Sequence, residues 1–310
     1  MRAKRAVVAI GGNSLIKSKQ QQTVQDQYEA MRETTASIAD MVQAGWEVAI
    51  THGTGPQVGF ILRRSELSRH ELHEVPLDAC GADSQGAIGY ALQQNMRNHL
   101  LGKGIDTPVA TVVTQVEVSA DDPAWQSPSK PIGSFMSAEM AAERKATEGW
   151  AVVEDAGRGW RRVVPSPEPL RIVEADVVRM LLDAGVIVIT VGGGGIPVVR
   201  EPNGNLKGVD AVIDKDLASA MLATVIEAGL LVITTAVEKV ALGWGTPQQR
   251  WVDRLTLAEA KQYLAEGTHF APGSMAPKIQ ACIDYLEAGG GEVLITDPGH
   301  LPAAIRGETG

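Results

Sequence analysis

Four consecutive glycines at residues 192–195 constrain this chain more than any other feature of its sequence. They follow an apolar run at residues 186–191 that is rich in β-branched side chains, a pattern typical of a buried parallel strand. Glycine lets main-chain N–H groups approach a ligand closely and form a concavity that favours anions, phosphates above all. We therefore expect Gly193 and Gly194 to lie against a phosphate-bearing ligand.

The same pattern, a strand followed directly by glycines, occurs at two further places. The apolar run 6–10 leads into Gly11, Gly12 and Asn13, and the run 46–51 leads, after one histidine, into Gly53, Thr54 and Gly55. A simple turn between a strand and a helix would account for any one of these segments. Three of them in one chain favour an enzyme that handles phosphate groups.

Strand-like and helix-like segments alternate along most of the chain. Strands are expected at residues 7–10, 47–51, 109–113, 186–191, 230–234 and 292–296, and helices at 23–44, 78–101, 174–184, 215–228, 257–266 and 275–288. Repeated strand–helix units require a mainly parallel sheet that is covered on both faces, with ligands at the carboxyl ends of the strands. The sequence therefore predicts an α/β fold.

Two segments depart from this alternation. Prolines frame residues 119–169, which also contain a short predicted helix at 137–147. We expect this stretch to form a small protruding subdomain within a single domain of residues 1–310. Residues 202–205, Pro-Asn-Gly-Asn, predict a β-hairpin turn.

Composition excludes several classes of protein. The net charge of −9 argues against non-specific binding of nucleic acid, which needs a basic surface. No apolar run approaches the roughly 20 residues of a membrane helix, and the two cysteines, Cys80 and Cys282, are far apart in sequence. We expect a cytoplasmic protein that binds neither nucleic acid nor a membrane. An anionic substrate must then be held by a local group of cations and N–H donors.

Lysines near predicted helix starts supply candidates for those cations. Lys215 opens a predicted helix between Asp214 and Asp216, and Lys278 lies in the first turns of another. A lysine at a helix N-terminus opposes the helix dipole, so its presence at two such places favours a ligand over a surface ion pair. Lys130, in a loop of the proline-framed segment, is a third candidate, although a solvated lysine is the ordinary state of a loop.

Other chemistries lack their motifs. The glycine segments fail the GxGxxG pattern and are followed by no acidic ribose ligand, which weakens a nicotinamide-dependent dehydrogenase. There is no GxxxxGK[ST] loop, and the His-Glu-Leu-His sequence at residues 70–73 is not HExxH. We expect no residues that hold a metal by themselves.

These segments together resemble carbamate kinases, a group within the amino-acid kinase superfamily. The resemblance covers about residues 5–307, and its pieces occur in the family's order. They are residues 9–13, 51–53 with 55–59, 80–82 with 84–86, 130–133, 159–165, 192–198, 212–219 and 273–278.

The resemblance implies a fold, an assembly and a reaction. The fold is a three-layer sandwich on a mainly parallel, roughly eight-stranded sheet, with residues 119–169 as a lid, and the assembly is a homodimer. The reaction is Mg²⁺-dependent phosphoryl transfer between ATP and carbamate, giving ADP and carbamoyl phosphate. Such enzymes usually run toward ATP in fermentative catabolism of arginine or related carbamoyl compounds.

The resemblance also implies roles for individual residues. The loops around the transferred phosphate match Gly11, Gly12, Asn13, Gly53 and Gly55, and Thr54 is the candidate residue between the last two. The lysines on the nucleotide phosphates match Lys215 and Lys278, with Asp216 as their organiser, and Lys130 matches the lysine that the lid carries to the site. The adenine side matches Ala236, Val237, Val240, Ser274 and Met275.

One departure leaves alternatives open. Thr54 stands where the resemblance leads us to expect asparagine, next to the acceptor. A kinase for another small carboxylate or a phosphonate therefore stays an alternative. A nucleotide-binding sensor without catalysis is a second one, which the presence of all three lysines disfavours.

Overall fold

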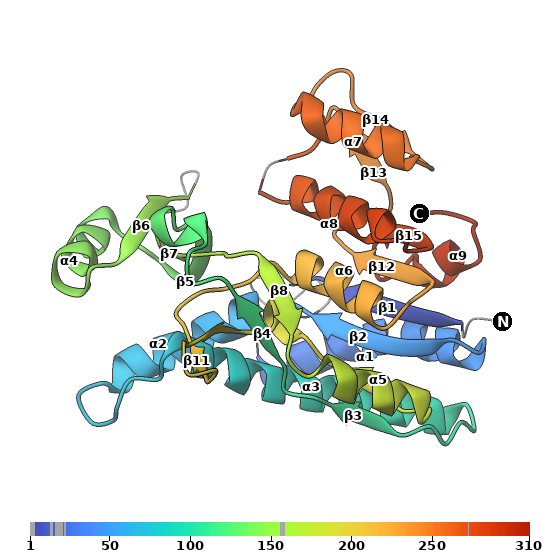
Figure 1. Ribbon diagram of the computed structural model, residues 1–310, viewed down its shortest axis with the longest axis horizontal. Coiled ribbons are helices and arrows are strands. Elements are labelled where there is room, and N and C mark those ends of the chain that lie inside the picture. Colours follow the sequence, from blue (N-terminus) through green and yellow to red (C-terminus); the bar gives the residue numbers. More distant parts are fainter. Residues whose placement is uncertain (1–3, 13–14, 16–20, 22, 156–158, 272) are drawn as a thin grey trace.

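A parallel sheet of six strands forms the centre of the computed structural model, which describes residues 4–12, 15, 21, 23–155, 159–271 and 273–310 (Figure 1). Its strands lie in the order β15 (Glu292–Thr296), β12 (Leu230–Thr234), β1 (Arg5–Ile10), β2 (Glu47–His52), β9 (Ile187–Ile189) and β3 (Val109–Thr111). Every neighbouring pair is parallel. All carboxyl ends therefore meet at one edge.

The expectation of roughly eight strands is wrong for this sheet, which has six among the described residues. The chain leaves the sheet after β3, and β4 (Gln115–Val118) pairs instead with β10 (Ile196–Arg200) and β8 (Pro169–Ile172). With β11 (Leu206–Gly208), these strands form a separate four-stranded sheet. Strands β10 and β11 are antiparallel, which confirms the hairpin expected at residues 202–205.

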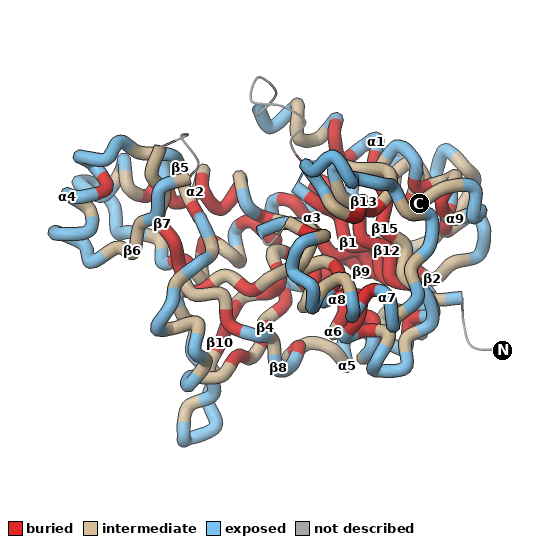
Figure 2. The backbone as a smooth tube through the Cα atoms, turned by 90° about the horizontal axis from the view of Figure 1, so that it is seen from above, coloured by how far each residue is buried: buried red, intermediate tan, exposed pale blue. Residues whose placement is uncertain are grey.

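Helices cover both faces of the central sheet and make three layers (Figure 2). One face carries α1 (Val24–Gln43), α3 (Leu77–Gly102) and α9 (Leu301–Ile305), and the other carries α5 (Ala175–Asp183), α6 (Lys215–Val225) and α8 (Met275–Glu287). Side chains along β1 alternate between the two cores. Ala6 and Val8 pack with the first set of helices, and Val7 and Ala9 pack with the second.

The predicted helices occur close to their expected ends because local signals define them. Thr23 caps α1 by accepting a hydrogen bond from the Asp26 N–H, and Asp26 reaches back to Thr23. Thr256 and Glu259 form the same capping box on α7 (Leu257–Glu266). Each of the six predicted strands is also present, although β3 and β9 are shorter than expected.

Several elements of the fold escaped the sequence analysis, one helix and one pair of strands among them. Helix α2 (Gly55–Ser68) begins within a stretch rich in glycine and proline, to which the sequence analysis assigns no helix or strand. Proline is tolerated there because the first turn of a helix needs no N–H donor. The antiparallel pair β13 (Val240–Leu242) and β14 (Arg250–Val252) is short, and its strands carry no long apolar alternation.

A separate three-stranded sheet lies within the proline-framed segment, in the order β5 (Lys130–Met136), β7 (Trp160–Val164) and β6 (Ala151–Glu154). Helix α4 (Ala138–Glu148) accompanies it. We call residues 130–164 the protruding unit, and Figure 1 shows it in green beyond the end of the main sheet. Among the described helices, none is long and apolar enough to span a membrane.

We expect Tyr285→Phe to destabilise the protein by about 1–3 kcal/mol, because it removes a buried bridge between two chain segments. The Tyr285 hydroxyl donates to the Ala228 carbonyl (2.6 Å) and accepts from the Gly291 N–H (3.2 Å). The matched control is Tyr90→Phe, since Tyr90 is 57% exposed and should change stability little. Urea denaturation of both variants measures the difference, and equal stabilities would contradict this role of Tyr285.

Candidate active site

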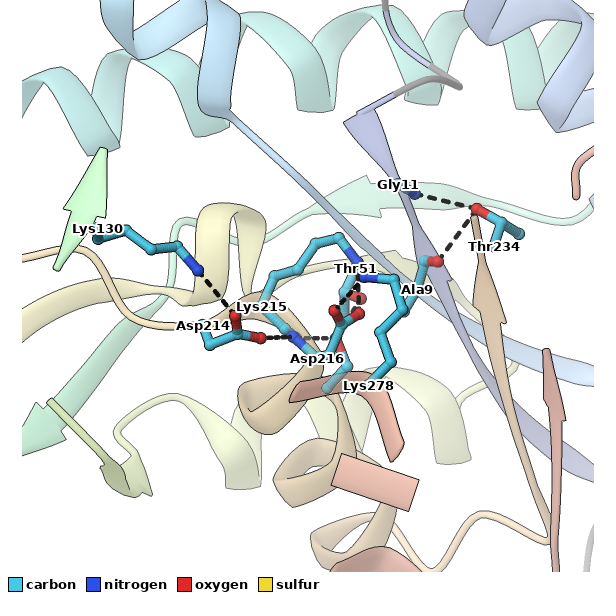
Figure 3. A network of polar contacts seen from close by, with 10 residues as sticks. Ala9, Gly11, Thr51, Lys130, Asp214, Lys215, Asp216, Thr234 and Lys278 are labelled. Carbon is cyan, nitrogen blue, oxygen red and sulfur yellow. Dashed lines mark hydrogen bonds and ion pairs between the residues drawn. The ribbon is translucent and has the colours of Figure 1, made fainter. Parts of the chain in front are cut away.

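The glycine segments converge at the carboxyl edge of the central sheet. The Gly11 N–H, after β1, donates to Thr234 Oγ1 (3.0 Å) at the end of β12 (Figure 3). The Gly53 N–H, after β2, donates to the Ile10 carbonyl (3.0 Å). The Gly53 N–H therefore serves the fold, and Gly55 at the first position of α2 is the better placed donor for a ligand. Gly12 follows Gly11 in the described chain, and Asn13 lies outside the described residues.

The four-glycine segment passes under the start of α2. Gly193 and Gly194 have φ of 68° and 91°, a backbone conformation that other residues seldom adopt. A Cβ on Gly193 would lie 2.4 Å from Thr54 Oγ1, and one on Gly194 would lie 2.6 Å from the Ile213 carbonyl oxygen. Only glycine therefore fits between Thr54 and the segment that leads into α6.

A buried glutamine holds the glycine segment in place. Gln85 Nε2 on α3 donates to the carbonyls of Gly192 (2.9 Å) and Thr114 (3.1 Å), and Gln85 Oε1 accepts from the Thr114 N–H (2.7 Å). The sequence analysis placed Gln85 in a family motif without assigning it a role. A polar side chain on the buried face of a predicted helix was the signal available for it.

The three candidate lysines meet around two aspartates at the start of α6 (Figure 3). Asp216 Oδ1 accepts from Lys215 Nζ (2.5 Å), and Asp216 Oδ2 accepts from Lys278 Nζ (2.7 Å). Asp214 Oδ2 accepts from Lys130 Nζ (2.7 Å), while Asp214 Oδ1 caps α6 by accepting from the Asp216 N–H (2.8 Å). Residues far apart in the sequence are thus brought together at one helix terminus.

Asp216 is the buried centre of this cluster, with only 3% of its surface exposed. Burial works to raise the pKa of its carboxyl, but the charges of Lys215 and Lys278 and their hydrogen bonds outweigh burial and lower it to about 2. Because the pKa is depressed, the carboxylate stays ionised and paired above about pH 4, and its contribution to stability is lost only as pH falls toward 2. The two lysines are therefore held at fixed positions under ordinary conditions.

A short polar chain anchors Lys215 to the sheet. Ser219 Oγ donates to the Lys215 carbonyl (2.5 Å), and the hydroxyls of Ser219 and Thr51 lie 2.6 Å apart. Thr51 lies on β2, and Lys215 and Ser219 lie one turn apart on α6. These positions bring the three residues into contact. The sequence analysis did not single out Thr51 or Ser219.

His52 at the end of β2 is buried beside the cluster. Its Nδ1–H donates to the Gly53 carbonyl (3.0 Å). Desolvation lowers the pKa of His52 to about 4, with a further lowering from the charge of Lys215, against the opposing hydrogen bond to Gly53. The imidazole is therefore neutral at neutral pH and adds no charge to the site.

The residues expected on the adenine side lie on two neighbouring segments. Ala236 and Val237 follow β12, and Val240 opens β13 and is buried. Ser274 is the residue before α8, and Met275 is its first residue, one turn before Lys278. Among the described residues, no hydrogen bond links these five to the aspartates or lysines of the cluster.

The described residues hold no group of three or more His, Cys, Asp or Glu side chains arranged for a metal ion. Both acidic residues of the cluster already accept hydrogen bonds from lysine. The site therefore offers cations, N–H groups and helix starts, which suits an anionic ligand with several oxygens.

His52 should titrate far below an ordinary histidine, and this is measurable by NMR of the ring protons. The unfolded chain takes up a proton near pH 6.5, whereas folded His52 does so near pH 4. Stability from this group is complete above pH 6.5 and decreases by about 3 kcal/mol as pH falls to 4. In the same spectrum His300 is the control, because Asp297 raises its pKa. A His52 signal that moves between pH 7 and 6 would contradict this burial.

Comparison of the sequence and the structure with known proteins identifies relatives of this chain. Residues 4–297 match the Amino acid kinase family. The carbamate kinase-like protein YahI of Escherichia coli is 52% identical over 98% of this chain and 96% of its own length. Carbamate kinase of Thermococcus kodakarensis is 46% identical over 99% and 98%. The structure of carbamate kinase from Giardia lamblia bound to AMP-PNP superimposes with a TM-score of 0.93 at 39% identity, covering 100% of this chain and 98% of that one.

Proposed function

This chain belongs to the amino acid kinase family, and we propose that it is a carbamate kinase, which transfers a phosphoryl group reversibly between ATP and carbamate to give ADP and carbamoyl phosphate. One observation supports this most: Lys130, Lys215 and Lys278 converge on Asp214 and Asp216 at the edge where the glycine segments end. The same arrangement suits the transfer chemistry.

The lysines stabilise the charge that develops during transfer. Phosphoryl transfer spreads negative charge over the equatorial oxygens, and catalysis consists mainly of positioning and electrostatic stabilisation. Lys215 and Lys278 exchange part of their contact with Asp216 for oxygens of the nucleotide, and Lys130 turns from Asp214 toward the transferred group. Carbamate is already an anion, so the reaction needs no general base.

The backbone segments bind the phosphates, and the adenine lies further out. Gly11, Gly12, Asn13, Gly53, Thr54 and Gly55 surround the transferred phosphate and acceptor, with Gly193 and Gly194 beneath them. The adenine rests against Ala236, Val237, Val240, Ser274 and Met275. Helix starts at α2 and α6 support these assignments, because their N-terminal dipoles favour phosphate.

Mg²⁺ accompanies the nucleotide in this proposal. Mg²⁺ keeps several water molecules and binds nucleotide oxygens with one or two protein carboxylates at most. The described residues fit that mode, because they hold no dense set of carboxylates and Asp214 and Asp216 already accept from lysines. Nucleotide oxygens and water would supply most ligands of the ion. Bound there, the ion would neutralise phosphate charge.

Further parts of the proposal concern the whole protein. Residues 119–169 act as a lid that brings Lys130 to the site, the enzyme is a homodimer, and it works in the cytoplasm toward ATP synthesis. Lys130 is the first residue of β5, which supports the proposal of a lid. Cys80 and Cys282 are buried and form no disulfide, which suits a reducing compartment. The family resemblance supports the dimer and the direction.

The reaction itself is the first test. Purified protein with Mg²⁺, ADP and carbamoyl phosphate should generate ATP in a luciferase-coupled assay, because this is the proposed reaction run toward ATP. Acetyl phosphate, the control donor, should be much poorer. Folded protein that makes no ATP above the enzyme-free rate would end the assignment.

The lysines should act in the transition state. Lys215 and Lys278 also pair with the buried Asp216, so their variants should lose some stability as well, and kcat is compared on folded protein. Losing one preorganised charge at a transferring phosphoryl group costs roughly 10²–10³-fold in kcat, which is the effect expected for Lys130→Met, Lys215→Met and Lys278→Met. The matched control is Lys207→Met on β11, an exposed lysine outside the cluster. Steady-state kinetics and melting curves are measured for all four. A cluster variant with near-normal kcat would remove that lysine from the site.

Thr54 determines how well the acceptor binds, and it supports a second candidate function, a kinase for a different small acid. Thr54 is 7% exposed, and no described residue forms a hydrogen bond with its hydroxyl. This hydroxyl is therefore open to a ligand or to water. An asparagine amide offers two N–H donors where threonine offers one O–H.

For carbamate as acceptor, Thr54→Asn should lower the KM for carbamoyl phosphate by up to about tenfold, one hydrogen bond's worth, and change kcat less. Thr54→Ser is the control, because it keeps the hydroxyl. A KM that Thr54→Asn leaves unchanged would make Thr54 structural. A lost kcat would favour the second candidate.

A further inference from the structure

A cavity of about 420 Å³ lies between α2 and the protruding unit. Its α2 wall runs from Gly59 through Leu62 and Arg63 to Glu66. At 1.5 Å per residue, this wall starts about 6 Å and ends about 16 Å along the helix from Gly55. On the other side it is lined by the later part of β5, by α4 and by Trp150 and Arg162. None of the lysines and aspartates of the cluster lines this cavity.

Positive charge is in surplus around this cavity. Of its three arginines, Arg63 pairs with Glu66 (3.0 Å), and Arg144 pairs with Glu148, a carboxylate outside the lining that also accepts from Arg69 (2.9 Å). Arg162 has no carboxylate partner among the described residues. In a chain of net charge −9, a local surplus of guanidinium groups selects for an anion.

Arg162 is held in place without using its hydrogen-bond donors. Its guanidinium lies 4.8 Å from the ring centroid of Trp150, and that of Arg144 lies 5.2 Å from the same residue's ring. The contact with the indole positions the cation, but an aromatic ring offers no oxygen to the N–H groups. A carboxylate or phosphate would supply two oxygens to the paired N–H groups of this guanidinium, which form a fork.

Apolar side chains complete the walls of the cavity. Ile132, Phe135 and Met136 on β5 and Met140 on α4 line it opposite Leu62. A volume of this size, mostly apolar and with a few convergent polar groups, is typical of a site for a small molecule. The walls suit a ligand that joins one anionic group to an apolar body.

We propose that this cavity is a second ligand site, for a small organic acid whose carboxylate or phosphate binds Arg162 and whose apolar body packs on Met136 and Met140. The site goes beyond the proposed function, because binding there involves no phosphoryl transfer. A ligand in it contacts both α2 and the protruding unit. Binding therefore favours the docked position of that unit, which the ion pair between Arg69 and Glu148 also holds.

Methionine methyl NMR tests the site directly, since two of its lining residues carry the probe group. With ¹³C-methyl-labelled methionine, benzoate and phenyl phosphate should each shift the Met136 and Met140 signals in a saturable way. Those signals are assigned from Met136→Leu and Met140→Leu. Phenol, the uncharged control, should bind at least about tenfold more weakly. Equal binding of phenol, or shifts confined to Met275 beside Lys278, would overturn the proposal.

Variants separate Arg162 from general charge effects. Arg162→Gln should weaken the binding of both acids by at least about tenfold, because it removes a charged hydrogen-bond donor. Arg64→Gln is the matched control: Arg64 is the exposed neighbour of Arg63 on α2, outside the lining, and it should bind as the parent does. If Arg162→Gln lowers the melting temperature too far, Arg162→Lys keeps the charge, loses the fork and should still bind more weakly.

Unchanged affinity in a folded Arg162 variant would overturn the site. The readout is independent of the kinase assay, so failure of one proposal is distinguishable from failure of the other.

Discussion

The pairing of one buried carboxylate with two lysines is the interaction on which the rest of the site depends. Without Asp216, Lys215 and Lys278 would be two like charges close together at the start of a helix whose dipole already repels them. With it, both ammonium groups are held in place before any ligand arrives. The fold holds these charges in position. Strands β1, β2 and β12 place α6 at the carboxyl edge of the central sheet, and the hydroxyls of Ser219 and Thr51 join α6 to β2.

The glycine segments depend on equally specific neighbours. Gly193 can lie under Thr54 only because it has no side chain, and Gln85 fixes the peptide before it. The proposed phosphate donors therefore belong to a backbone that neighbours before α2, on α3 and before α6 hold in place. Preorganisation of this kind avoids reordering the site in each catalytic cycle.

Much of this arrangement was predictable from the sequence. Runs such as residues 230–234 are apolar, β-branched and bounded by clear turns, so β12 has the expected limits, and the same holds for α7 with its capping box. Lys215 and Lys278 were recognisable because a cation at a helix start is unusual.

The parts that escaped prediction depend on contacts distant in sequence. Helix α2 exists despite poor helix formers because its apolar face packs against the rest of the fold, and Leu62 and Val58 are buried. The roles of Gln85 and His52 appear only when strands and helices are assembled. Local patterns could not predict the number of strands in the main sheet either. Strand β4 pairs with β10, which is distant in sequence, and does not pair with β3.

Because Lys130 is the first residue of β5, the position of the protruding unit determines where this positive charge lies. The protruding unit cannot lift from the core without withdrawing that ammonium group from Asp214, because Lys130 belongs to the unit through β5 and Asp214 belongs to the core as the N-cap of α6. If this unit acts as the proposed lid, admission of bulk water and loss of the third cation would be one event. In the proposed mechanism, a nucleotide held while the unit is raised would face an incomplete set of charges, and this would disfavour hydrolysis of ATP.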